Sequence, residues 1–290
     1  MIKFITTLLT LLCITGVHAQ YAYFGTRGKI AFDKITFTKA RIRSMTQQMD
    51  PSRSMRFGTG NLDNMPESST QKLVLHFDES STLLLPEVTA ENATSTGRGN
   101  RGAGGGNIRI TGGQGNISVR GNSGGGMVVA RGGMGSNSKI MYQDLKKNIS
   151  NLQLEIDQKY TITDSLNNIT WRFTDEYRDI AGFECRRVNG ATPDSLYIVA
   201  FYTDQIPVSA GPALTSGLPG MILGLAIPEM HIQYWATKVD YTNDTIPMDW
   251  KDKKATPITM DEFVKNIGRM YQRGRDSGTA RRQVLEQLIY

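Results

Sequence analysis

The chain has few of the residues that bind metals or form disulfides. It contains two cysteines, Cys13 and Cys185, and three histidines among 290 residues. Neither a paired-cysteine spacing nor a His-Glu-x-x-His pattern occurs. The sequence therefore predicts no metal site, no cofactor and no catalytic residue. We expect Cys13 to be lost with a leader segment, which leaves Cys185 as a single thiol that is either buried and inert or available for an intermolecular bond.

Long apolar runs are also missing after the first twenty residues. Spanning a bilayer takes roughly 18 apolar residues. The apolar segment at residues 217–227 is shorter than this, and Pro219 and Gly224 interrupt it. We interpret it as a buried strand region.

The first residues have the three parts of a secretory signal. Lys3 supplies a positive charge, an apolar run follows, and residues 17–19 end it at Ala19. We expect cleavage after Ala19 and a periplasmic or secreted protein. A lipoprotein anchor needs a small residue before the cysteine, and Leu12 stands there, so we do not expect a lipoprotein.

The formal net charge is +6, and the basic residues gather in two regions. Either region would suit an anionic surface such as lipid headgroups or polysaccharide, although ordinary solvation explains both. Export argues against nucleic acid as a partner. The clusters are Arg98, Arg101, Arg109, Arg120, Arg131 and Lys139, and then Lys265, Arg269, Arg273, Arg275, Arg281 and Arg282.

Glycine is concentrated in one stretch, since residues 91–139 hold 16 of the 30 glycines. Glycine loses the most conformational entropy when it is ordered. We therefore predict that residues 91–140 are a flexible, disordered insertion. A Gly-x-Gly-x-x-Gly match at residues 97–102 lacks the strand and helix that a dinucleotide site requires.

The rest of the chain favours a mainly β fold. Apolar and polar residues alternate in residues 20–90, which we predict to form N-terminal strands, and in residues 141–255, which we predict to be the main sheet. Consecutive strands joined by short turns predict an antiparallel meander. Residues 256–290 are expected to form a basic helical tail, with Thr259 as an N-cap. In outline this resembles the half-barrel of periplasmic lipoprotein carriers.

One segment resembles a known family. Residues 206–212 and 216–223, with a Gly-Leu-Pro-Gly-Met-Ile core, resemble the signature of the GLPGLI family, in which Met221 replaces the usual leucine. Residues 180–185 resemble that family's Gly-aromatic-x-Cys segment. The resemblance implies a Gram-negative envelope protein without an assigned activity. The motif is either a structural turn or the lip of a ligand cavity, and its residues are Pro207, Gly211, Pro212, Gly217, Leu218, Pro219, Gly220, Met221 and Ile222.

Two further patterns concern chemistry. Glu229 and His231 would share one face of a strand, with methionines nearby. This arrangement would allow a site for a soft metal. Packing of the methionines in the core is the simpler interpretation. Three Asp-Ser/Thr-aliphatic tripeptides fit a motif that some Gram-negative bacteria O-glycosylate. The hydroxyl residues are Ser165, Ser195 and Thr245, and ordinary turn residues are the alternative.

These observations favour a non-enzymatic envelope protein that binds an apolar or amphiphilic ligand, such as a lipid, or a membrane partner. An accessory or docking protein for an outer-membrane transport system is the first alternative. A hydrolase whose site the sequence does not reveal is the second. The oligomeric state is open.

Overall fold

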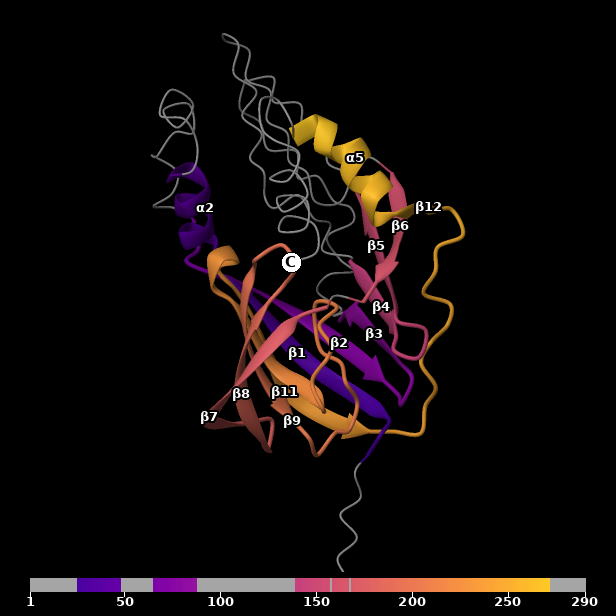
Figure 1. Ribbon diagram of the computed structural model, residues 1–290. Helices are drawn as coiled ribbons and strands as arrows, with labels where there is room; N and C mark the ends of the chain where they lie inside the picture. The colour runs from indigo at the N-terminus through magenta and orange to yellow at the C-terminus, as the bar shows by residue number, and fades with distance from the viewer. Residues whose placement is uncertain (1–24, 48–64, 88–138, 157, 167, 272–290) are drawn as a thin grey trace, which may run out of the picture.

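The protein is built around one large β-sheet (Figure 1). The computed structural model describes residues 25–47, 65–87, 139–156, 158–166 and 168–271. The first six strands are β1 (Gly28–Thr36), β2 (Ser69–Phe77), β3 (Ser81–Pro86), β4 (Ile140–Asp144), β5 (Ile149–Glu155) and β6 (Lys159–Ser165). The other six are β7 (Thr170–Ile180), β8 (Phe183–Ala191), β9 (Tyr197–Thr203), β10 (Met221–Ile227), β11 (Ile232–Tyr241) and β12 (Thr256–Thr259).

Two meanders make up this sheet. Strands β1 to β6 pair in sequence, strands β7 to β11 do the same, and β11 joins the two sets by pairing with β1. The prediction of a mainly β fold is confirmed. The sheet is mixed rather than wholly antiparallel, because β12 lies parallel to β6 at one edge. The sheet is open, with β12 at one end of the strand order and β7 at the other.

Side-chain alternation gives the sheet an inner and an outer face. On β2, Leu73, Leu75 and Phe77 are buried and face the main core, while the residues between them are more exposed. The same alternation puts Ile30 and Phe32 of β1 in this core. We call this side the inner face; the sheet bends around it (Figure 1).

Part of the outer face is covered by the connection from β11 to β12. Trp250 of this connection stacks on Tyr142 of β4, with ring centroids 5.1 Å apart, and Ile246 packs in the same small cluster. Asp252 binds Lys159 at 2.7 Å. These contacts explain why Leu83 on the outer side of β3 is buried and why Ile140 and Tyr142 of β4 are partly buried.

Two helices lie beyond the same end of the sheet in Figure 1, α2 (Thr38–Gln47) and α5 (Met260–Tyr271). The Thr259 hydroxyl accepts from the Glu262 backbone N–H at 3.3 Å, so Thr259 is the N-cap of α5 that the sequence predicts. The Glu262 carboxylate accepts from the Thr259 backbone N–H at 3.2 Å in return. Phe263 of this helix packs edge-on against Tyr160 of β6 at 5.3 Å.

Two details differ from the sequence prediction. The tail was expected to be helical from residue 256, but it begins with the strand β12. Helix α2 lies within the region that was expected to hold only strands. The predicted leader at 1–19, the predicted insertion up to residue 138 and the end of the predicted tail from residue 272 lie outside the described residues.

No helix among the described residues is long and apolar enough to cross a membrane.

Candidate functional site

The segment that resembles the Gly-aromatic-x-Cys pattern forms a tight hairpin turn. Ile180 of β7 pairs with Phe183 of β8, and only Ala181 and Gly182 lie between them. Both of these residues have positive φ, +51° and +85°, as a type I′ turn requires. This short turn directs the end of β7 towards β10, where the Ile180 side chain lies against Gly224.

The GLPGLI-like motif lies in the long connection between β9 and β10, and most of it is buried in the main core. Pro207, Gly217 and Pro219 are exposed. The other predicted motif residues are buried: Gly211, Pro212, Leu218, Gly220, Met221 and Ile222.

A compact turn stands at the centre of this connection. Ala213 and Leu214 both have φ near +56°, and the Thr215 hydroxyl donates to the Pro212 carbonyl at 2.7 Å. The Gln143 amide of β4 donates to the Thr215 carbonyl at 3.4 Å. The connection therefore reaches across the inner face to the other meander.

The motif glycines stand where a side chain has no room or the backbone is left-handed. A Cβ on Gly220 would overlap the carbonyl group of Thr203. One on Gly211 would lie 2.6 Å from the Ile222 Cβ. Gly217 has φ +91°, a value that side chains with a Cβ rarely adopt. These constraints support the structural interpretation of the motif at those three positions.

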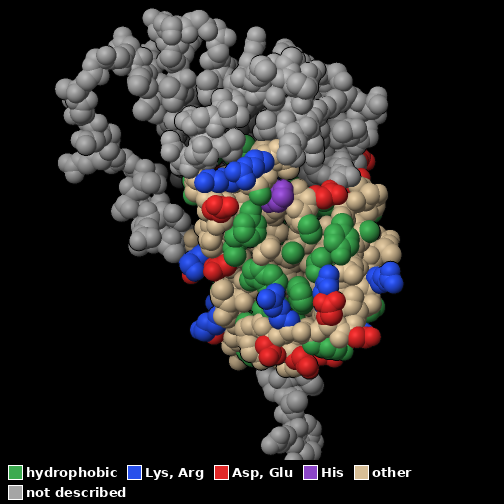
Figure 2. Space-filling view, turned by 90° about the vertical axis from the view of Figure 1, so that its left-hand side faces the viewer, with side chains coloured by type: hydrophobic (Ala, Val, Ile, Leu, Met, Phe, Trp, Pro, Cys, Tyr) green, Lys and Arg blue, Asp and Glu red, His purple; other side chains and the backbone are tan. Residues whose placement is uncertain are grey.

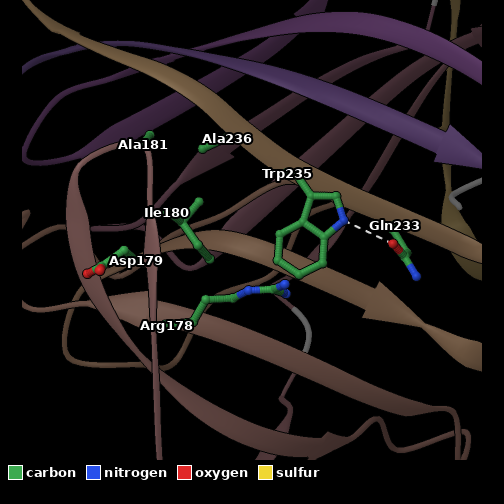
Figure 3. A pocket seen from close by; sticks show the side chains of 7 residues that line it. All are labelled: Arg178, Asp179, Ile180, Ala181, Gln233, Trp235 and Ala236. Carbon is green, nitrogen blue, oxygen red and sulfur yellow. Dashed lines mark hydrogen bonds between the residues drawn. The ribbon is translucent and has the colours of Figure 1, made fainter.

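An open groove of about 540 Å³ lies on the outer face, between the β7–β8 turn and β11 (Figure 3). The Trp235 indole N–H donates to the Gln233 side-chain oxygen at 2.9 Å. The Arg178 guanidinium lies 4.9 Å from the centre of the Trp235 ring, and the Asp179 carboxylate points away from the indole. The lining residues are Arg178, Asp179, Ile180, Ala181, Gln233, Trp235 and Ala236.

Apolar surface continues from the groove across the neighbouring strands. Phe201 of β9 lies 5.6 Å from Trp235, and the Arg178 guanidinium lies 5.8 Å from the Phe201 ring. Val199 and Ala226 are paired neighbours that are also half-buried. Figure 2 looks onto the side where β7 and β8 lie and shows hydrophobic side chains gathered between separate basic and acidic ones.

Sequence patterns did not identify the groove as a candidate site. Two signals were available. Residues 180–185, which resemble the family segment, include the lining residues Ile180 and Ala181. Trp235 falls on the same strand face as Gln233 and Thr237 rather than with the buried Tyr234. Arg178 gave no signal, because its position beside Trp235 depends on how the β7–β8 turn folds over the sheet.

The proposed pairing of Glu229 with His231 on a strand face is wrong. Glu229 lies in a 3₁₀ turn, η2 (Pro228–Met230), and His231 follows it with φ +54°. This reversal turns the chain before β11 begins. Among the described residues, no group of three or more His, Cys, Asp or Glu side chains is placed to hold a metal.

Of the two alternatives for the thiol of Cys185, the buried one is confirmed. Cys185 has no exposed surface. Burial raises the pKa of the Cys185 thiol to about 12, and the nearby charge of Asp179 adds to this effect. A thiol that stays protonated is a poor nucleophile.

The three candidate glycosylation residues lie apart from the groove and from one another in the chain. Ser165 ends β6, Ser195 lies in the β8–β9 turn with φ +62°, and Thr245 lies between β11 and β12. All three are exposed. Two of the aliphatic residues that follow them, Leu196 and Ile246, are buried.

The middle of the chain matches a family of unknown function. Its model is described as "Protein of unknown function (Porph_ging)", the family occurs in Bacteroidetes, and the match covers residues 146–224. This stretch runs from just before β5 into β10 and includes the Gly217–Ile222 motif and the β7–β8 turn. No curated protein matches the chain.

Two solved structures share a distant likeness with the chain, those of PNGF-II in the C2 and P21 space groups. The TM-scores are 0.43 and 0.45, and both are 12% identical. They cover 80% and 83% of this chain but only 30% and 32% of PNGF-II, so the chain spans about a third of that protein's length. This likeness is too distant to inform the function.

Proposed function

We propose that this chain is an exported, non-enzymatic envelope protein of the GLPGLI type that binds an amphiphile with an anionic headgroup in the outer-face groove. The observation that carries the proposal is the stack of the Arg178 guanidinium on Trp235, at the edge of a half-buried apolar surface. Such a surface offers one place for the apolar part of an amphiphile and another for its charged headgroup.

The volume of the groove, about 540 Å³, falls within the range of about 300–1,000 Å³ that is typical of small-molecule sites. Polar groups make up more of its exposed lining than apolar groups do. Trp235, Phe201 and Ile180 would contact an acyl chain. Aromatic side chains supply large contact areas for such ligands.

The polar groups favour an anionic headgroup. An arginine that stacks through its face keeps the N–H groups of its edge directed outward, where they can bind a carboxylate or phosphate in pairs. The Gln233 oxygen accepts from Trp235, so its amide nitrogen is the part that can donate to a ligand. The Asp179 carboxylate points away and does not face the proposed headgroup position.

The family resemblance and the groove share residues, which supports linking them. Ile180 and Ala181 line the groove and belong to the segment that resembles the Gly-aromatic-x-Cys pattern. Export rests on the leader pattern that ends at Ala19. The docking alternative depends on residues 91–139, of which all but the last lie outside the described residues, so it stays a prediction.

A fluorescence titration tests the proposal directly, because Trp235 lies in the groove. Dodecyl phosphate, below its critical micelle concentration, should change the emission saturably, and dodecyl maltoside, with a neutral headgroup, should bind more weakly. Arg178→Gln should reduce the affinity for dodecyl phosphate about tenfold, since a charge-assisted hydrogen bond contributes about 1.5–3 kcal/mol. The variant should leave the affinity for dodecyl maltoside nearly unchanged.

Two tryptophan variants locate the signal. Trp235→Phe should remove the emission change. Trp250→Phe should keep it, because Trp250 belongs to the β11–β12 connection and packs against β3 and β4. An emission change that survives Trp235→Phe, or a wild-type protein that binds neither amphiphile saturably, would rule out this groove as the binding site.

A further inference from the structure

The edge strand β7 exposes two aromatic side chains next to one arginine. This strand stands at the end of the sheet order, and Phe173 and Tyr177 keep 47% and 56% of their surface exposed. The guanidinium carbon of Arg186, on β8, lies 5.5 Å from the centre of the Phe173 ring and 5.9 Å from that of the Tyr177 ring. One ligand can therefore reach both rings and the guanidinium at once.

A bulge in β7 separates the two rings. Phe173 pairs with Val188 and Tyr177 pairs with Arg186, which leaves residues 174–176 of β7 opposite a single residue of β8. A bulge bends its strand, re-aims nearby side chains and blunts a sheet edge against pairing with another strand. This edge therefore presents side chains to a ligand rather than a regular ladder to a further strand.

Two arginines of β8 hold the bulge in place. The Arg186 Nε–H donates to the Thr174 carbonyl at 2.6 Å. The Thr174 hydroxyl donates to the Arg187 carbonyl at 2.8 Å, and the Arg187 guanidinium binds the Glu176 carboxylate at 2.6 Å. The rings on either side of the bulge are thus carried by a well-anchored backbone.

This aromatic patch is separate from the outer-face groove. Tyr177 and Arg178 are consecutive residues of β7, and consecutive side chains of a strand point to opposite faces. Because Arg178 lies in the groove beside Trp235, Tyr177 belongs to the other side of the sheet. The Phe173 ring packs edge-on against the buried Tyr202 of β9 at 6.0 Å, which fixes its orientation.

The charges of the patch are balanced within it. The Arg186 guanidinium donates to the Asp175 carboxylate at 3.0 Å, and the Asp175 side chain is 97% exposed. The contacts with Thr174 and Asp175 use two of the five N–H groups of a guanidinium, and a carboxylate accepts through both oxygens. A charged ligand gains little from such a balanced pair. A neutral diol matches it, since each hydroxyl both donates and accepts.

We propose that Phe173, Asp175, Tyr177 and Arg186 form a binding site for a neutral oligosaccharide. The C–H groups of a sugar ring carry a slight positive charge, and the faces of aromatic rings are negative, so the two stack. Neighbouring hydroxyls of the sugar would then donate to Asp175 and accept from Arg186, in charge-assisted hydrogen bonds. This site does not depend on the groove proposed above, because it lies on the opposite face of the sheet.

Calorimetric titration with oligosaccharides tests the site. The probes are neutral hexasaccharides of glucose, xylose, mannose, galactose and N-acetylglucosamine, with hexagalacturonate as the acidic comparison. We expect a neutral probe to bind saturably and hexagalacturonate to bind more weakly. Tyr177→Ala should weaken the binding of the neutral probe about fivefold, the loss of one aromatic contact. Asp175→Ala should weaken it about tenfold, the loss of one charge-assisted hydrogen bond. Both side chains are exposed, so both variants should fold.

Two variants serve as matched controls. Tyr197→Ala removes another exposed tyrosine, which lies on β9 and donates to the Asn189 side chain rather than joining the patch. Arg178→Gln alters the groove on the other face. Both variants should bind the neutral probe as tightly as the wild-type protein does.

Three results would overturn the proposal. Two of them are that no neutral probe binds, or that wild type and Tyr177→Ala bind the probe equally. The third concerns the rival occupant, a second copy of the chain, and is measured by sedimentation velocity. A wild-type dimer that becomes a monomer in Tyr177→Ala would assign the patch to self-association, whereas a wild-type monomer leaves the rings open to the sugar, as the proposal requires.

Discussion

Replacing Gly220 by alanine is the sharpest test of how the motif connection packs. A Cβ at this position would overlap the Thr203 carbonyl oxygen, and it would lie 2.7 Å from the Thr203 carbonyl carbon and 2.9 Å from the Asp204 Cα. These are backbone atoms, which cannot rotate away as a flexible side chain would. The end of β9 or the start of β10 must therefore shift.

The expected cost follows from these contacts. Overpacking a well-filled site costs about 1–3 kcal/mol, and a collision with backbone belongs at the upper end of that range. The shift would also strain the hydrogen bond from the Met221 N–H to the Ile206 carbonyl, 3.0 Å long, which contributes about 1 kcal/mol. We expect Gly220→Ala to lower the free energy of unfolding by about 3–4 kcal/mol.

Urea unfolding, followed by circular dichroism and by tryptophan fluorescence, measures this loss. Gly182→Ala is the matched control, because Gly182 has φ +85° but nothing lies within 4 Å of its added Cβ. It isolates the cost of a left-handed alanine, about 1–2 kcal/mol. If Gly220→Ala costs no more than Gly182→Ala, the packing of this connection beneath Thr203 is wrong.

Three other predictions follow from the described residues. Cys185 should not react with a thiol reagent at pH 8 in the native protein and should react fully in urea, because burial raises its pKa to about 12; a fast native reaction would contradict its burial. Folding lowers the pKa of Lys34 from 10.5 to about 8. Between these two pH values the unfolded chain binds more protons than the folded protein does. The free energy of unfolding should therefore rise by up to about 3 kcal/mol from pH 8 to above pH 10.5. Urea midpoints of wild type and Lys34→Met across this range should diverge accordingly, and parallel curves would refute the shift. Protein purified from its native envelope should carry sugar at Ser165, Ser195 or Thr245, and an intact mass equal to that of the unmodified chain would exclude this modification.

Strand periodicity made much of the sheet predictable. Leu73, Leu75 and Phe77 alternate with polar residues, and they all face the core. Register across distant strands has no such local signal. The pairing of β11 with β1 joins residues more than 190 positions apart, and β12 pairs with β6 in parallel, which no hairpin rule predicts.

The candidate groove depends on these long-range pairings. Arg178 meets Trp235 only because the turn at Ala181 and Gly182 brings the end of β7 over the sheet. Local patterns could therefore name the glycines that shape the motif, but not the arginine that lies beside Trp235.

Strand β10 connects the motif to the groove. It begins at Met221, directly after the tightly packed Gly220, and three positions later Gly224 lies under Trp235. A Cβ on Gly224 would stand 2.6 Å from the Trp235 ring and 3.0 Å from the Ile180 side chain, so the groove depends on the close approach that glycine permits there. Because Gly220 directly precedes the short strand that carries Gly224, we expect a displacement at Gly220 to be transmitted to the surface on which Trp235 rests. The GLPGLI-like motif can thus influence the proposed binding in the groove without lining the groove itself.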